Sequence, residues 1–176
     1  MSAASALLSL AQTDVTRPIP KPALLAALSA PPFVNLEGSF NTRDLGLLPP
    51  LADSGSNPVR IRPGLVYRTG SLNGLTNRGK STLQELGVKS IFDLRSVREH
   101  AIAPDPAVEG VEGVWVPCEE GDATVELGEF VGGAGEKGYV RMYMDVLRWY
   151  GEGLKEVLRF VRDRGGEGLL VHCNGE

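Results

Sequence analysis

The feature that most constrains the fold of this 176-residue sequence is an apolar run near its end, Gly168–Cys173. Leu169, Leu170 and Val171 follow one another without the polar residues that alternate in a strand with one solvent-facing side. A strand buried on both faces is typical of the centre of a parallel sheet. The run therefore predicts an α/β protein, with a central and mostly parallel sheet flanked by helices.

Residues 76–94 show a helix followed directly by a strand. Thr76 is a suitable N-cap residue, and Gly87 stands where helices often end in a left-handed conformation. The following apolar run is β-prone and ends in polar residues. In all, the sequence predicts strands near 65–68, 88–94, 111–116 and 168–173.

The longest amphipathic pattern runs from Tyr139 to Val161 with helical spacing of its apolar residues. Gly151 and Gly153 interrupt it, which favours one bent helix or two abutting helices. We interpret its apolar stripe as core packing. The preceding residues, 120–138, are rich in Gly and Glu and predict a mobile loop or lid.

Two regions differ in composition. Residues 1–32 are rich in Ala, Ser and Pro, with an extended linker at 17–22 and a possible short helix between Pro22 and Pro31. They predict a flexible N-terminal arm. Residues 33–176 have the composition and the alternation of apolar and polar segments that are typical of a single folded domain.

Charge and residue usage exclude several functions. The net charge of −4 argues against broad nucleic-acid binding, and no apolar run reaches the ~18 residues of a membrane span. Two cysteines cannot form a disulfide framework, so we expect a cytoplasmic protein with free thiols. The two histidines and two cysteines lack metal-site spacing, and no nucleotide-binding loop is present. No metal or cofactor is predicted.

The residues that could carry chemistry lie at the end of the last strand. Ligands of open α/β sheets bind at the carboxyl ends of the strands, where the sequence places Cys173. A thiolate at that position could attack phosphorus while backbone amides and an arginine hold the phosphate oxygens. An inert buried thiol fits the same placement, and these residues alone leave both readings open.

Four motifs together carry a family resemblance. They occur in the order FNTRDLG (Phe40–Gly46), IRPGLVYRTGSLNGLT (Ile61–Thr76), LQELGVKSIFDLRS (Leu83–Ser96) and GLLVHC (Gly168–Cys173). In order and spacing the sequence resembles the atypical tyrosine-phosphatase-like proteins of fungi and bacteria. The resemblance implies a phosphatase-like fold and a cysteine-dependent hydrolase without a cofactor. Its expected substrates are phosphotyrosine, other phosphoproteins or phosphoinositides.

The resemblance also implies residue roles near the strand ends. Cys173 matches the nucleophile, and His172 matches the residue that helps to set the thiolate. Asp93 matches the aspartate of the family's Asp-Leu-Arg segment. It is either the general acid or a structural carboxylate paired with Arg95 or with loop amides.

Other charged residues have less specific roles. Arg43, Asp44 and Arg68 fall on the family's N-terminal signature, where we favour a structural ion-pair network over substrate contact. Asp122 and Asp145 are alternative acids. Asp122 lies in the predicted loop, whereas Asp145 lies on the predicted helix and is interpreted as part of a solvated face.

One departure from the family affects activity. The family's phosphate loop places an arginine six residues after the cysteine, which is position 179, whereas the sequence ends at Glu176. We therefore expect a C-terminally truncated form that is inactive as written. The alternatives are a non-catalytic pseudophosphatase or binding remnant and, more weakly, a sulfurtransferase-like domain, which would leave the first two motifs unexplained.

Overall fold

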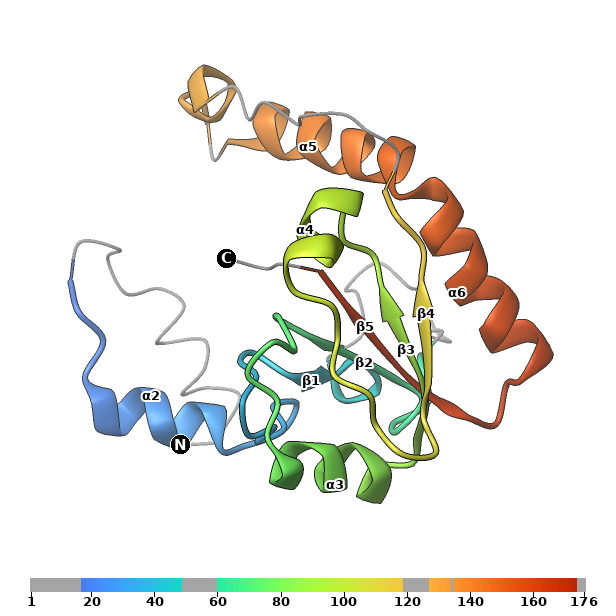
Figure 1. Cartoon of the computed structure of the whole chain (residues 1–176). Helices are drawn as coiled ribbons and strands as arrows, with labels where there is room; N and C mark the ends of the chain where they lie inside the picture. The colour runs from blue at the N-terminus through green and yellow to red at the C-terminus, as the bar shows by residue number, and fades with distance from the viewer. Residues whose placement is uncertain (1–16, 49–59, 119–126, 134, 174–176) are drawn as a thin grey trace.

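The computed structural model describes residues 17–48, 60–118, 127–133 and 135–173. These residues form one sheet with the strand order β1-β2-β5-β3-β4 (Figure 1). The strands are β1 (Arg43–Asp44), β2 (Val66–Thr69), β3 (Val88–Asp93), β4 (Glu112–Trp115) and β5 (Gly168–His172). Only β1 is antiparallel to its neighbour. The predicted α/β class, the four predicted strands and the central place of the last one are confirmed.

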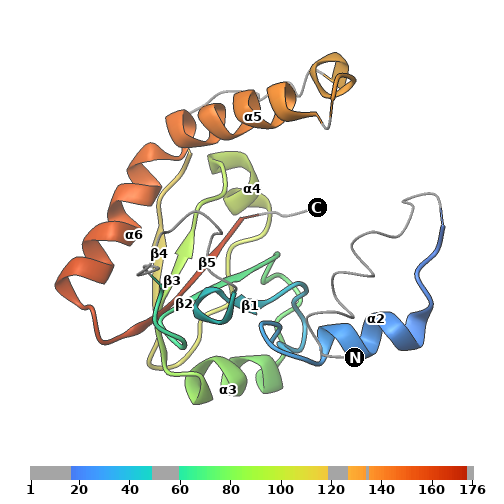
Figure 2. The same cartoon turned by 180° about the vertical axis from the view of Figure 1, so that it is seen from behind.

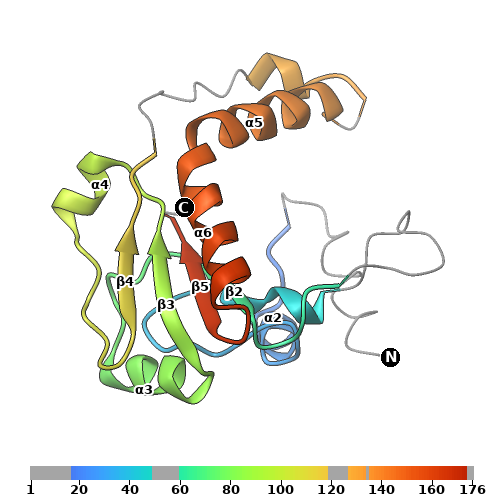
Figure 3. The ribbon, with the colours of Figure 1, turned by 90° about the vertical axis from the view of Figure 1, so that its right-hand side faces the viewer.

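Helices pack against the sheet or continue beyond it. The α-helices are α2 (Lys21–Leu28), α3 (Asn77–Glu85), α4 (Val97–Ile102), α5 (Glu136–Trp149) and α6 (Gly151–Asp163), and the 3-10 helices are η1 (Leu45–Leu47) and η2 (Leu127–Phe130). Helix α6 lies across the sheet over β3 and β5 (Figure 3). Among these helices, none has both the length and the apolar character needed to cross a membrane.

The local signals around α3 act as the sequence predicts. The Thr76 hydroxyl accepts a hydrogen bond from the Gly79 amide at 3.2 Å, which satisfies a backbone donor in the first turn. Gly87 has a φ of +74°, a conformation that residues with a Cβ adopt only with strain. The chain can therefore leave the helix and enter β3 within two residues.

Two apolar clusters cover the two faces of the sheet. The first joins α3 to the sheet through Leu83, Tyr67, Ile91 and Leu170. The second joins α6 to the opposite face through Phe160, Phe92, Leu94 and Leu169. Because neighbouring residues of β5 contribute to different clusters, Leu169 and Leu170 are both fully buried. This explains the apolar run without alternation.

The predicted core stripe over residues 139–161 is only half correct. Two abutting helices form, and α6 packs against the sheet, with Gly153 so close to Leu94 that a Cβ would lie 2.7 Å from that side chain. Helix α5 instead continues beyond the sheet (Figure 2), and its apolar side chains are exposed. The exposed residues are Tyr139, Val140, Tyr143, Met144, Val146 and Leu147. Periodicity identifies an apolar face but does not determine what lies against it.

The arm and the loop are described in part. Within the predicted arm, α2 confirms the expected short helix, and Pro22 lies in its first turn. Within the predicted loop at 120–138, residues 120–126 and 134 lie outside the described residues. Residues 127–130 form η2, and α5 already begins at Glu136, so the end of that segment is helical rather than loop.

Candidate active site

Cys173 follows the central strand at its carboxyl end, as predicted. Strand β5 ends at His172, which pairs in register with Asp93 at the end of β3. Cys173 and Asp93 therefore lie at the same edge of the sheet, the edge at which ligands of open α/β sheets bind. His172 is buried and Cys173 is half-buried.

Asp93, the last residue of β3, and Arg95 form a buried ion pair at this edge of the sheet. The Arg95 Nε and Nη2 atoms each donate to one oxygen of the Asp93 carboxylate, both at 2.8 Å. The Arg95 amide also donates to Asp93, at 3.0 Å. Arg95 is only 1 % exposed, so the two-pronged contact holds its guanidinium in one orientation.

A second carboxylate, Asp105, completes the network. One Asp105 oxygen accepts from Arg95 Nη2 at 2.8 Å, and the other lies 2.5 Å from His172 Nε2. Asp105 thus connects the ion pair to the residue that precedes Cys173. Sequence reasoning missed it because it lies between two prolines, outside any periodic pattern and 67 residues from His172.

His100 and Trp115 also contact the Asp93–Arg95 pair. The sequence predicted no role for either residue at this site. The His100 ring lies with Nδ1 2.7 Å from Asp93 Oδ2 and stacks on the Trp115 ring, with the centroids 4.1 Å apart. The Trp115 indole donates to the Arg95 carbonyl oxygen at 3.2 Å. The last turn of α4 and the end of β4 thereby shield the Asp93–Arg95 pair from solvent.

This environment keeps Asp93 ionised. Burial by itself disfavours the charged form, but hydrogen bonds from Arg95 and His100 outweigh it and lower the pKa of Asp93 from 3.8 to about 2. At neutral pH the carboxylate carries no proton to donate.

The lowered pKa predicts a loss of stability in acid. The unfolded chain takes up a proton at Asp93 near its ordinary pKa of 3.8, whereas the folded chain does so only near 2. The stabilisation is therefore complete above about pH 5 and is lost as the pH falls to 2, at a cost of about 2 kcal/mol. Urea unfolding at several pH values measures it. In Asp93→Asn the free energy of unfolding should no longer show this decrease between pH 5 and pH 2, whereas the exposed control Asp163→Asn should still show it. An equal decrease in the two variants would contradict the assignment to Asp93.

The same side chains include possible metal ligands. Ligand atoms of Asp93, Asp105 and His172 lie within 4.8 Å of one another. The Arg95 guanidinium already supplies positive charge to both carboxylates, and His172 Nε2 and Asp105 Oδ2 are at hydrogen-bond distance. The arrangement fits a hydrogen-bonded network built around an arginine better than a metal site, whose ligands each need a free lone pair.

The Cys173 thiol is surrounded by groups with opposing effects. Burial raises the pKa of Cys173, and the positive charge of Arg68 offsets part of that rise. Tyr150, where α5 meets α6, is half-buried near both cysteines, and burial is the main cause that raises the pKa of Tyr150 to about 12. Among the described residues, the positive charges of Arg68 and Arg95 favour the Cys173 thiolate, and burial opposes them.

The N-terminal signature residues do not form one ion-pair network. The Asp44 carboxylate accepts from the backbone amides of Gly46 at 2.8 Å and Gly64 at 2.7 Å, which ties the turn after β1 to the turn before β2. Arg43 and Arg68 face each other across β1 and β2. In the part of the chain that the structure describes, no ion pair joins either arginine to a carboxylate.

The structure describes only one of the two residues predicted as alternative general acids. Asp122 lies outside the described residues. Asp145 lies on α5, the helix that continues beyond the sheet, and it is half-buried rather than fully solvated.

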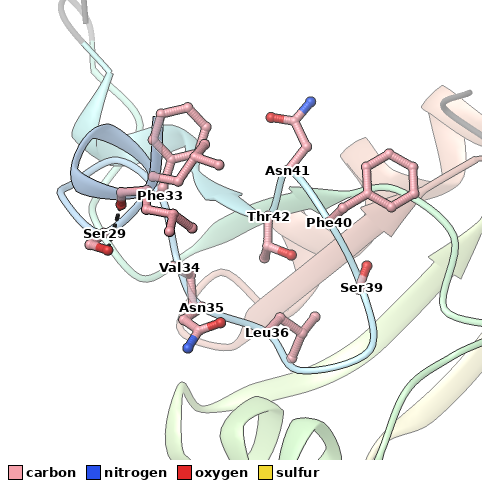
Figure 4. A pocket seen from close by; sticks show the side chains of 11 residues that line it. Ser29, Phe33, Val34, Asn35, Leu36, Ser39, Phe40, Asn41 and Thr42 are labelled. Atoms are coloured by element: carbon pink, nitrogen blue, oxygen red, sulfur yellow. Dashed lines mark hydrogen bonds between the residues drawn. The ribbon is translucent and has the colours of Figure 1, made fainter. Parts of the chain in front are cut away.

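A groove of about 470 Å³ lies between α2 and the segment before β1. Phe33, Val34 and Phe40 give it apolar walls, and Asn35 and Asn41 add polar groups (Figure 4). None of the predicted site residues lines this groove. The groove and the edge that carries Cys173 are therefore separate features.

Comparison with known proteins agrees with this arrangement. A sequence profile of the tyrosine phosphatase family matches residues 34–175. The chain is also 38 % identical over 66 residues to the triple specificity protein phosphatase PtpB of Mycobacterium tuberculosis, an alignment that covers 38 % of this chain and 21 % of that protein. The aligned region thus spans about a fifth of the relative's length. Since the profile covers most of the chain, from Val34 before β1 to Gly175 after Cys173, the chain belongs to the tyrosine phosphatase family.

Proposed function

We propose that this protein is a cysteine-dependent phosphatase with Cys173 as its nucleophile. One observation carries the proposal: the Cys173 thiol lies at the carboxyl end of the central strand, beside a network of a buried arginine, a buried carboxylate and a half-buried carboxylate. The family assignment supports the same class of reaction. The substrates we propose are phosphorylated proteins or phosphoinositides, in the cytoplasm, where a thiol stays reduced.

The reaction proceeds through a covalent intermediate. The Cys173 thiolate attacks phosphorus in line, the bond from phosphorus to the leaving oxygen breaks, and that oxygen takes up a proton from solvent water. Water then attacks the cysteinyl phosphate, which releases inorganic phosphate and restores the thiolate. Backbone amides and a guanidinium stabilise the charge on the phosphate oxygens, as the family resemblance implies for an arginine at position 179.

The buried network positions the strand ends. Asp93, with a pKa of about 2, is a positioning residue rather than the acid that protonates the leaving oxygen. It fixes Arg95, and Arg95 fixes Asp105, which in turn holds the His172 imidazole. A rigid residue directly before the nucleophile keeps the thiol in a defined orientation.

Trapping of the intermediate tests the proposal. The protein is incubated with para-nitrophenyl phosphate, quenched in acid and digested, and its cysteine peptides are analysed by mass spectrometry. We expect one added phosphoryl group on the Cys173 peptide and none on the Cys118 peptide. Because a guanidinium at 179 should favour the covalent step, residues 1–176 and a form continued with an arginine at 179 are compared. Unmodified Cys173 in both forms, together with cysteine-independent turnover, would contradict the proposal.

A further inference from the structure

Arg43 and Arg68 form a pair of like charges directly opposite each other. The register of β1 and β2 pairs these two residues, and opposed residues of antiparallel strands project from the same face of the sheet. Like charges in this position are destabilising. A bound anion would offset this repulsion.

The protein supplies no such anion among its described residues. Neither guanidinium takes part in an ion pair there, and the neighbouring Asp44 is already engaged by two backbone amides. The Arg43 Nε atom is buried without a hydrogen-bond partner, and its guanidinium lies 6.0 Å from the centre of the Phe33 ring. Burial, followed by the charge of Arg68, lowers the pKa of Arg43 below its usual value. The pair thus has unused donors and uncompensated charge.

The pair lies on the same face of the sheet as Cys173. Arg68 pairs in register with Val171, and Cys173 is two residues further along, so both side chains project from the same face. Strand geometry puts the Cα atoms of Arg68 and Cys173 about 8 Å apart, with Arg43 one strand further away. Arg68 is exposed, and its charge acts on the thiol. A ligand at Cys173 can therefore extend over β2 to both arginines.

We propose that Arg43 and Arg68 bind a second phosphoryl group of the substrate, beside the group that Cys173 attacks. This inference rests on the proposed phosphatase function and narrows its substrate class to molecules that carry two phosphoryl groups. Two planar guanidinium groups match the charge and the oxygen geometry of a phosphate dianion, whereas a carboxylate would balance only one of them.

Binding measured without turnover tests the subsite. In a Cys173→Ser background, titration with inorganic phosphate should shift the Nε–Hε NMR signals of Arg43 and Arg68. Arg43→Gln and Arg68→Gln should each weaken phosphate binding about tenfold or more. Arg78→Gln, at an exposed position on α3, is the matched control and should leave binding unchanged. Phosphate affinity that is the same in all three variants would overturn the subsite, whether or not the protein is a phosphatase.

Two further measurements separate a substrate subsite from other roles. An aryl bisphosphate should bind at least tenfold more tightly than the aryl monophosphate in the same background, and Arg43→Gln should remove that gain. Phosphate binding at the pair without this gain would contradict the assignment to substrate.

The midpoint of thermal unfolding should rise in Arg68→Gln because repulsion is relieved, while a fall would indicate a structural role for Arg68.

Discussion

Replacement of Cys173 by serine is expected to lower the hydrolysis of para-nitrophenyl phosphate by at least about 10³-fold. Serine is close to cysteine in size, so the fold should be preserved. Its hydroxyl, however, is far less acidic than a thiol and would need a general base to become a nucleophile. Asp93 is engaged by Arg95 and His100, and His172 Nε2 is held by Asp105. These contacts occupy the Asp93 carboxylate and the Nε2 atom of His172, so neither is available to activate a serine.

The matched control for this prediction is Cys118→Ser. Cys118 is the other cysteine of the chain and is half-buried, but it follows β4, two strands away from β5. Its replacement should leave turnover unchanged. Both variants are assayed in residues 1–176 and in the form continued with an arginine at 179. A Cys173→Ser variant of the extended form that keeps the rate of its extended parent would show that another group is the nucleophile.

Replacement of Arg95 by methionine is expected to lower the free energy of unfolding by about 3–5 kcal/mol. Methionine fills a similar space but leaves the buried Asp93 and the half-buried Asp105 near each other without their shared positive charge. Removing one partner from a buried ion pair costs far more than the pair contributes, because the remaining charge stays desolvated. For a domain with an ordinary stability of about 5–15 kcal/mol, this loss is severe.

Urea unfolding of Arg98→Met gives the matched control. Arg98 lies three residues further along, on α4, and its side chain is exposed. The same substitution there should change the free energy of unfolding by less than about 0.5 kcal/mol. Arg95→Lys should fall between the two, because lysine restores the charge without the two-pronged contact. If Arg95→Met and Arg98→Met unfolded alike, the buried network would have no energetic role.

The sequence alone was sufficient for the parts of the fold that local patterns encode. The apolar run at 168–173 identified the central strand, since only a strand covered on both faces lacks polar alternation. Thr76 and Gly87 marked the ends of α3 through capping and left-handed geometry, which depend on a few neighbouring residues. The placement of Cys173 beside Asp93 followed from the shared carboxyl edge of parallel strands.

Contacts between distant segments could be established only from the tertiary structure. Asp105 has no motif around it, yet it bridges Arg95 and His172 because the loop after α4 returns to the strand ends. Asp44 was expected in an ion pair with Arg43 or Arg68, but its carboxylate instead accepts hydrogen bonds from two backbone amides in the adjacent turns. The apolar stripe of α5 was expected in the core, and its exposure reflects where the helix leaves the sheet. Periodicity and capping are properties of neighbouring residues, whereas the partner of a side chain depends on how the whole chain packs.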